Sequence, residues 1–440
     1  MSFRRALGPF DATMLVIGAI IGAGIFINPY IVAQRLDSGF LVLAAWAAGG
    51  AIAMAGAFAF AELGSLFPQA GGHYAYLRDA YHPFAGFLYG WALLLMIECG
   101  AIAAVAITFA QYALRFVGRA GAATSPLAIL AIVIVAAVNY LGVKPGSRLL
   151  NVFVILKTAA LVLLIAAGLV MPGAEDAAAE AMRQDSPPLM IAFGAALIAI
   201  MFSYGGWQNL NYVAEEIRNP KRTLPLAVIA GTTVVVVVYV LVNFVYLKAI
   251  GHAGLANTMT PAADTVNALL GDAGDRLIAL TIAISTFGFL DLTMLAPTRV
   301  YYAMAADGLF FPSVARLHPK YQTPSLAIVI QTGWAILLLL TGGYAQLVDY
   351  VVFADWIFFG LAAASLFVFR RRHPLAERPE GTYATPGYPI LPALFVLVAV
   401  WIVASVLWTN PLRSGLGVAI LATGVPAYLY WNRRKDRRPQ

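Results

Sequence analysis

Two long apolar stretches of this chain are each interrupted by glycine near the middle. The first stretch, 11–34, contains Gly-Ala-Gly at 22–24, and the second, 188–214, contains Ser-Tyr-Gly-Gly at 203–206. Each stretch exceeds the roughly 20 apolar residues that cross the hydrocarbon core of a bilayer. Helix-breaking residues are tolerated at that depth only where the freed backbone lines a cavity or is buried in protein. We therefore predict a binding cavity between two broken transmembrane helices.

The composition is that of an integral membrane protein. Of the 440 residues, 61% are hydrophobic and only 11% are charged, and the mean hydropathy is +0.81. Runs of apolar residues long enough to span a bilayer predict an all-α membrane protein. The twelve predicted spans lie near 11–34, 39–66, 83–113, 125–143, 148–170, 188–214, 224–247, 274–305, 325–341, 344–369, 388–408 and 411–431.

Lys and Arg gather in alternate connecting segments, above all 370–372 and the basic tail 432–440. Positively charged connections face the cytoplasm, so we expect a multi-pass protein of the plasma (inner) membrane with both termini cytoplasmic. This places 1–10 inside and the loop 171–187 outside. The basic residues behind the net charge of +7 then face anionic lipid. The net charge therefore gives no indication of nucleic-acid binding. The expected macromolecular environment is the lipid bilayer.

The order of the spans predicts an inverted repeat. A unit of five spans that starts inside ends outside, so the next unit of five runs the other way through the membrane. Spans one to five (11–170) and six to ten (188–372) form such a 5+5 pair, related by a pseudo-two-fold axis in the membrane plane. Spans eleven and twelve (388–431) lie outside the repeat. The two halves share the interruption and the spacing but no marked residue identity.

The helix ends at the two breaks suit the two charges of an α-amino acid. After the first break, the next half-helix exposes free N–H groups and a partial positive charge, which favours a carboxylate. Before the second break, the preceding half-helix exposes carbonyls and a partial negative charge, which favours an ammonium group. The alternative is structural, because Gly18 and Gly22 have the small-xxx-small spacing of close helix packing. Two breaks five spans apart favour the binding site.

Motifs around both breaks resemble a known transporter family. The sequence Ile-Ile-Gly-Ala-Gly-Ile-Phe at 20–26 is similar to the first-span signature of the amino acid/polyamine/organocation (APC) superfamily. Phe-Ser-Tyr-Gly-Gly-Trp at 202–207 and Asn-Tyr-Val-Ala-Glu-Glu-Ile-Arg-Asn-Pro at 211–220 closely resemble the sixth span of the L-type amino acid transporter (LAT) family. Further similarity at 61–76 and 303–324 extends the resemblance over spans one to ten. It implies a bacterial-type LAT protein with a LeuT-like fold and discontinuous helices 1 and 6.

The resemblance also implies which residues bind the substrate. By this resemblance, the substrate carboxylate is expected on the backbone of 22–24, and the ammonium group on carbonyls near Ile20, Phe202 and Gly205. Phe202 matches an aromatic gate over the substrate, while Trp356 is alternatively an ordinary core or lipid-facing aromatic. The implied substrate-binding residues are Ile20, Gly22, Ala23, Gly24, Phe202, Ser203, Gly205, Gln208, Val105 and Trp356.

The expected substrate is a neutral L-α-amino acid. The helix ends already match both of its charges, and the side-chain positions Phe202, Gln208, Val105 and Trp356 carry no formal charge. A cationic amino acid is the alternative, because Glu98 in the third span can supply a counter-charge. The size of the substrate side chain is left open.

Charged residues within the spans are candidates for function. In LAT relatives a lysine of the fifth span resembles a surrogate for the sodium ion of LeuT-type symporters, and Lys157 matches it. The resemblance therefore implies sodium-independent transport, whereas snorkelling toward an interface is the alternative for this lysine. Glu98 either responds to protons or pairs with a basic group. The roles of the remaining intramembrane carboxylates are equally open: Asp291, Asp349 and Asp355.

The connection after the sixth span contains Glu215 and Glu216, which are candidates for an intracellular gate of ion pairs. A solvated loop without a gating role is the alternative. Among transport modes, the LAT resemblance favours exchange, while Glu98 and more distant APC relatives favour proton-coupled symport.

Other classes of protein and partner are disfavoured. No nucleophile, base or metal-ligand constellation stands at a recognisable spacing, so we expect neither an enzyme nor a cofactor or metal. A channel would show rings of charge or filter-like carbonyl loops. Animal LAT proteins are tethered to a glycoprotein by a disulfide after the third span. Here the only cysteine is Cys99, inside that span, so we expect no disulfide-linked heavy chain. The oligomeric state is not predicted.

Overall fold

The computed structural model describes residues 7–68, 71–141, 147–170, 188–295, 297–321, 323–378, 381–409 and 411–436. The predicted loop 171–187 and the chain ends 1–6 and 437–440 lie outside this part. The described residues form helices. One isolated β-bridge, between Leu7 and Ile217, is also present among them.

The helices begin and end as follows: α1 Pro9–Ile20, α2 Gly24–Arg35, α3 Gly39–Leu66, α4 His73–Ala80, α5 Pro83–Ala92, η1 Leu93–Ile97, α6 Glu98–Phe116, α7 Ser125–Tyr140, α8 Ser147–Val170, α9 Leu189–Tyr204, η2 Trp207–Glu216, α10 Pro220–Ala256, α11 Pro261–Leu270, α12 Asp272–Leu295, α13 Thr298–Ala306, η3 Pro312–Ala315, α14 Ser325–Thr341, α15 Tyr344–Arg372, η4 Leu375–Glu377, α16 Ile390–Thr409 and α17 Pro411–Asp436.

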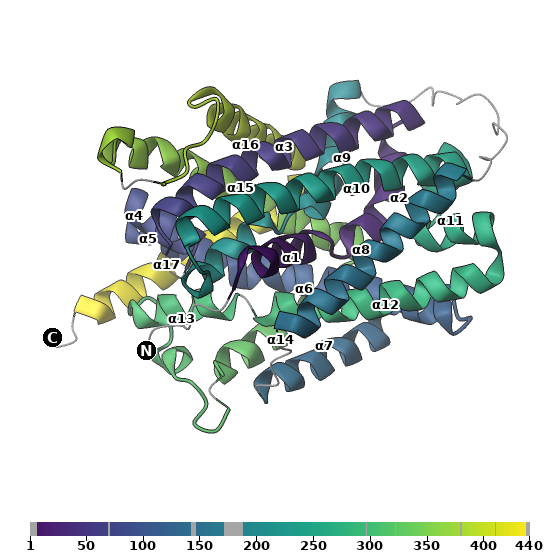
Figure 1. The fold of residues 1–440 in the computed structure, drawn as a ribbon. Coiled ribbons are helices and arrows are strands. Elements are labelled where there is room, and N and C mark those ends of the chain that lie inside the picture. The colour runs from purple at the N-terminus through teal and green to yellow at the C-terminus, as the bar shows by residue number, and fades with distance from the viewer. Residues whose placement is uncertain are drawn as a thin grey trace.

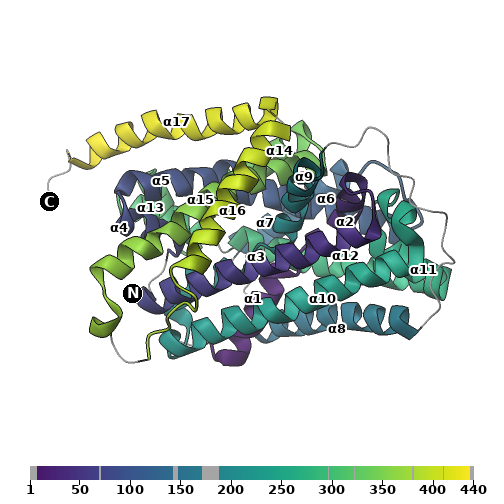
Figure 2. The same ribbon diagram turned by 90° about the horizontal axis from the view of Figure 1, so that it is seen from above.

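The long helices run side by side in one bundle (Figures 1 and 2). Nine helical segments of the described chain are long and apolar enough to cross a membrane. Three shorter apolar helices, Ser125–Tyr140, Val154–Val170 and Ser325–Thr341, occupy the predicted fourth, fifth and ninth spans. The all-helical membrane architecture is thus confirmed. The total of twelve spans, the inverted repeat and the sidedness stay predictions.

Burial separates central helices from peripheral ones. In the segment Pro83–Phe116, which contains α5, η1 and α6, 83% of the apolar window is buried, against 28% in α16 and 22% in α17. Helix α12 packs along α6, and α10 packs along α3 and α1. A helix that is apolar all round and buried belongs to the interior, whereas α17 lies along one edge of the bundle (Figure 2). The cavity described below is therefore built on the central helices.

Both predicted helix breaks are present. Helix α1 ends at Ile20 and α2 starts at Gly24, so three residues separate the halves of the first span. Helix α9 ends at Tyr204; Gly205 is extended and Gly206 has φ +120°, a conformation that favours glycine. The chain continues as the 3₁₀ segment η2 instead of a second α-helix. Tighter i→i+3 turns leave the backbone after the second break less regular than an α-helix.

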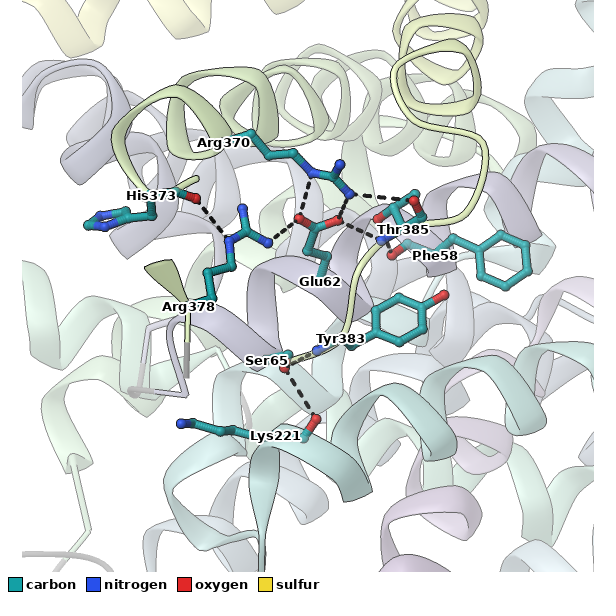
Figure 3. A network of polar contacts seen from close by, with 9 residues as sticks. All are labelled: Phe58, Glu62, Ser65, Lys221, Arg370, His373, Arg378, Tyr383 and Thr385. Carbon is teal, nitrogen blue, oxygen red and sulfur yellow. Dashed lines mark hydrogen bonds and ion pairs between the residues drawn. The ribbon is translucent and has the colours of Figure 1, made fainter. Parts of the chain in front are cut away.

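At one end of the bundle, the carboxylate of Glu62 ties the segment after α15 to α3 (Figure 3). Glu62 is fully buried and accepts hydrogen bonds from Arg370 and Arg378, both at 2.7 Å, and from the N–H of Thr385 at 2.7 Å. A buried charge requires such partners, since removing one leaves the others desolvated and unpaired. The neighbouring Ser65 hydroxyl accepts from the N–H of Tyr383 at 3.1 Å. This network fixes the α15–α16 connection.

Candidate functional site

A cavity lies where the two breaks meet. It is lined by the α1–α2 break, the end of α9 and the start of η2, together with residues of η1, α6, α12 and α15. All the predicted substrate-binding residues except Ser203 border it: Ile20, Gly22, Ala23, Gly24, Val105, Phe202, Gly205, Gln208 and Trp356. The elements that the sequence singled out separately are thus gathered around one space, and their roles in binding stay predictions.

The two breaks touch each other through backbone. A Cβ atom added at Gly206 would overlap the carbonyl of Ala19, and one added at Gly24 would lie 2.6 Å from the Cα of Ser203. Ser203 therefore lies behind Gly24 and not in the cavity. Its hydroxyl donates to the carbonyl of Ala199 at 3.0 Å and accepts from Asn28 at 2.8 Å, which braces α9 against α2. Glycine at 24 and 206 permits this close approach.

The start of α2 offers hydrogen-bond donors to the cavity. The first N–H groups of a helix have no intrahelical acceptor, and in the described structure those of Ala23 and Gly24 have no backbone acceptor elsewhere. The N–H of Gly22 already donates to the carbonyl of Ile20 at 2.7 Å. The free donors that the cavity borders are therefore those of Ala23 and Gly24, with the positive end of α2 behind them.

The end of α9 offers an acceptor. The carbonyl of Met201 accepts from the N–H of Gly205 at 3.0 Å, whereas the carbonyl of Phe202 has no donor among the described residues. The carbonyl of Ile20 accepts from Gly22 and from the Tyr239 hydroxyl at 3.0 Å, so its lone pairs are both in use. Of the three predicted ammonium ligands, Ile20, Phe202 and Gly205, the carbonyl of Ile20 is therefore already occupied in this conformation.

Gln208 and Trp356 have contacts beyond the cavity. The side-chain oxygen of Gln208 accepts the N–H of Gly206 at 2.8 Å, so this residue also stabilises the second break. Trp356 is 3% exposed and packs against Phe359 and Phe395 while it borders the cavity. Trp356 is therefore a buried aromatic that also borders the cavity, and its role in binding stays a prediction.

Lys157 lies behind the first break. Its ammonium group donates to the carbonyls of Gly18 at 2.8 Å and Ile21 at 2.5 Å, and it lies 5.5 Å from the ring centre of Phe289 on α12. The side chain is 5% exposed and does not border the cavity. Gly18 lets α8 come close, because a Cβ there would lie 2.6 Å from the side chain of Val154. The lysine thus joins α8 to the broken end of α1, which differs from snorkelling toward an interface.

The intramembrane carboxylates have different surroundings. Glu98 on α6 and Asp355 on α15 both border the cavity. Asp291 instead accepts from the Asn139 amide at 2.6 Å, and Asp349 lies 3.9 Å from Arg35 on α2. Asp355 is the main site residue absent from the predicted set. Its position next to Trp356 was a usable signal, because successive helical residues are about 100° apart and can border the same space.

The predicted gate residues are placed as follows. Phe202 packs edge-on against Tyr344 with the ring centres 6.3 Å apart. Glu215 is half-buried near the end of η2, and the side chain of Glu216 lies outside the described part. A described ion pair joins Arg78 of α4 to Asp307, next to the end of α13, at 2.9 Å.

The model of the amino acid permease family matches residues 7–425 of this chain. The chain belongs to that family. The permease shares 30% identity over 435 residues with the serine/threonine exchanger of Bacillus subtilis, and the aligned region covers 98% of each chain. Identity is also 30% with the human cystine/glutamate transporter (99% of this chain, 87% of the relative) and with the human large neutral amino acids transporter small subunit 2 (99% and 82%).

These relatives are LAT-type transporters of the APC superfamily, so the resemblance drawn from the sequence motifs is confirmed. The permease is a membrane transporter and not an enzyme. Its one cysteine, Cys99, is buried in α6 beside the carbonyl of Gln331. In the described part of the chain, no three His, Cys, Asp or Glu residues are grouped closely enough to hold a metal ion.

Proposed function

We propose that the permease moves L-α-amino acids across the plasma membrane by alternating access, without sodium, as an exchanger. The observation that carries this proposal is the pairing of free N–H groups at Ala23 and Gly24 with the unpaired carbonyl of Phe202 around one cavity. Donors at a helix start suit a carboxylate, and carbonyls at a helix end suit an ammonium group. An α-amino acid carries both groups one carbon apart.

The position of Lys157 supports sodium independence. The side-chain amine of Lys157 donates to the carbonyls of Gly18 and Ile21, so it occupies the broken end of α1 without a free ion. If the contact between α8 and α1 needs no free ion, the substrate-free carrier has no ion-driven preference for facing either side of the membrane. Such a carrier suits exchange. Proton-coupled symport is the second candidate, because the buried carboxylate of Glu98 borders the cavity.

The class of substrate side chain is open within this proposal. The prediction of a neutral amino acid rests on four uncharged positions, Phe202, Gln208, Val105 and Trp356. However, two carboxylates also border the cavity. The relatives are named for serine and threonine, for cystine and glutamate, and for large neutral amino acids. These names do not agree on one class of side chain, so the substrate class has to be argued from the residues of this cavity.

Counterflow with the purified chain in liposomes tests the proposal. We expect labelled amino acid to enter liposomes loaded with unlabelled amino acid and to stay out of empty ones. Replacing sodium by choline is expected to leave this uptake unchanged, and no heavy chain is needed. A sodium requirement would contradict the proposal. Uptake into empty liposomes under an inward proton gradient would establish symport instead.

A further inference from the structure

We infer that Glu98 and Asp355 form a subsite for a positively charged substrate side chain, so that the permease carries basic L-α-amino acids with an ammonium or guanidinium group. This inference rests on the proposed function, because it concerns the far end of the same amino acid. It replaces the expectation of a neutral substrate.

The two carboxylates lie in the wall of the substrate cavity. Glu98 comes from α6 and Asp355 from α15, and neither helix carries one of the two breaks. Glu98 is 9% exposed, and the two helices pack against each other. The cavity therefore offers backbone groups for the α-amino acid moiety on two elements and acidic side chains on two others.

Neither carboxylate has a hydrogen-bond or ion-pair partner among the described residues. The buried lysine of α8, Lys157, donates to the carbonyls of Gly18 and Ile21 and does not border the cavity. By contrast, the buried carboxylate of Glu62 is paired with two arginines. The unpaired carboxylates of Glu98 and Asp355 in the cavity wall therefore point to a ligand.

The physical cost of such a pair favours a cationic ligand. Burying a charge without a partner is strongly unfavourable, and two carboxylates close together repel each other. A guanidinium group presents five donors in a planar fork and can reach both carboxylates, while an ammonium group provides three donors. A neutral side chain would leave both carboxylates unpaired unless they bind protons.

The rest of the wall suits a cation as well. Aromatic side chains border the same cavity, among them Phe202, Tyr212 and Trp356, and cations are attracted to aromatic faces. Described residues of the wall include no Lys or Arg, so no positive side chain opposes a basic ligand there. Among the described residues that border the cavity, the formally charged ones, Glu98 and Asp355, are both negative.

Exchange of L-arginine and its neutral isostere L-citrulline by the full-length protein in liposomes tests the inference. The two ligands have almost the same shape, so their difference reports the charge. We expect arginine to be preferred by at least about tenfold, the value of one charge-assisted hydrogen bond. Glu98→Gln and Asp355→Asn should each lower the apparent affinity for arginine about tenfold or more and leave citrulline nearly unchanged.

Matched variants separate charge from folding. Asp291→Asn removes a carboxylate that is bonded to Asn139 and lies outside the cavity wall, so it should leave the ratio of arginine to citrulline unchanged. Asp355→Glu keeps the charge and should restore much of the preference for arginine. Gel filtration establishes that each variant is folded, and the wild-type ratio alone decides the inference if the variants at 98 and 355 do not fold.

Equal exchange of arginine and citrulline, or a preference for leucine and citrulline over arginine, would overturn the acidic subsite while leaving amino acid exchange intact. An unchanged arginine-to-citrulline ratio in folded Glu98→Gln and Asp355→Asn would overturn it too. Absence of exchange with every amino acid would instead overturn the proposed function.

Discussion

Gly206→Ala is expected to abolish exchange and to lower thermal stability. Gly206 has φ +120°, and a Cβ at this position would overlap the carbonyl of Ala19 across the contact between the two breaks. A non-glycine residue in such a conformation costs about 1–3 kcal/mol, and the overlap pushes the breaks apart in addition. The measurement is counterflow in liposomes together with thermal unfolding of the purified variant.

Gly205→Ala is the matched control. Gly205 has φ −63°, and its added Cβ would make only ordinary contacts, 3.5 Å from the carbonyl of Met201 and 3.6 Å from that of Phe202. We expect this variant to fold normally and to keep measurable exchange, whereas Gly205→Val should fold and lose exchange by filling the cavity. Gly24→Val is a weaker test, because its side chain would meet the backbone of Ser203. Wild-type exchange by Gly206→Ala would show that the breaks need not touch.

Lys157→Ala should reduce exchange by at least about tenfold, because two charge-assisted hydrogen bonds at the broken end of α1 are lost. The carbonyls of Gly18 and Ile21 would remain buried without a donor, so α1 would no longer be held against α8. Initial rates of counterflow, with protein content matched, measure the effect.

Lys248→Ala is the control for the loss of a lysine. Lys248 also donates to a carbonyl of α8, that of Leu169 at 3.1 Å, but from an exposed position. Exposed charges contribute little, so this variant should exchange at the wild-type rate. Equal rates for Lys157→Ala and wild type would reduce Lys157 to a bystander.

Some of the site could be predicted from the sequence because its signals are local. Glycine inside an apolar run indicates a helix break, whatever the helix packs against. A lysine in the middle of a span rarely faces lipid. The positions of Gly22, Gly206 and Lys157 follow from such signals, and the residues around them gather as expected.

Other features depend on packing that the sequence leaves open. Ser203 faces α2 instead of the cavity, since Gly24 lets the two backbones meet. The carbonyl of Ile20 is occupied by the hydroxyl of Tyr239, more than 200 residues away in the chain. That Asp355 borders the cavity depends on the rotation of α15, and the sequence only suggests it through the neighbouring Trp356. Helix rotation and long-range hydrogen bonds are the parts that required the structure.

The most direct test compares binding of an L-α-amino acid with binding of its N-acetyl and carboxamide derivatives to the purified permease. The side chain is the same in all three, so only the groups assigned to the two breaks differ. If the N–H groups of Ala23 and Gly24 hold the carboxylate and the carbonyl of Phe202 holds the ammonium group, each derivative should bind at least about tenfold more weakly. Equal competition by either derivative would contradict the assignment of that charge to its helix end.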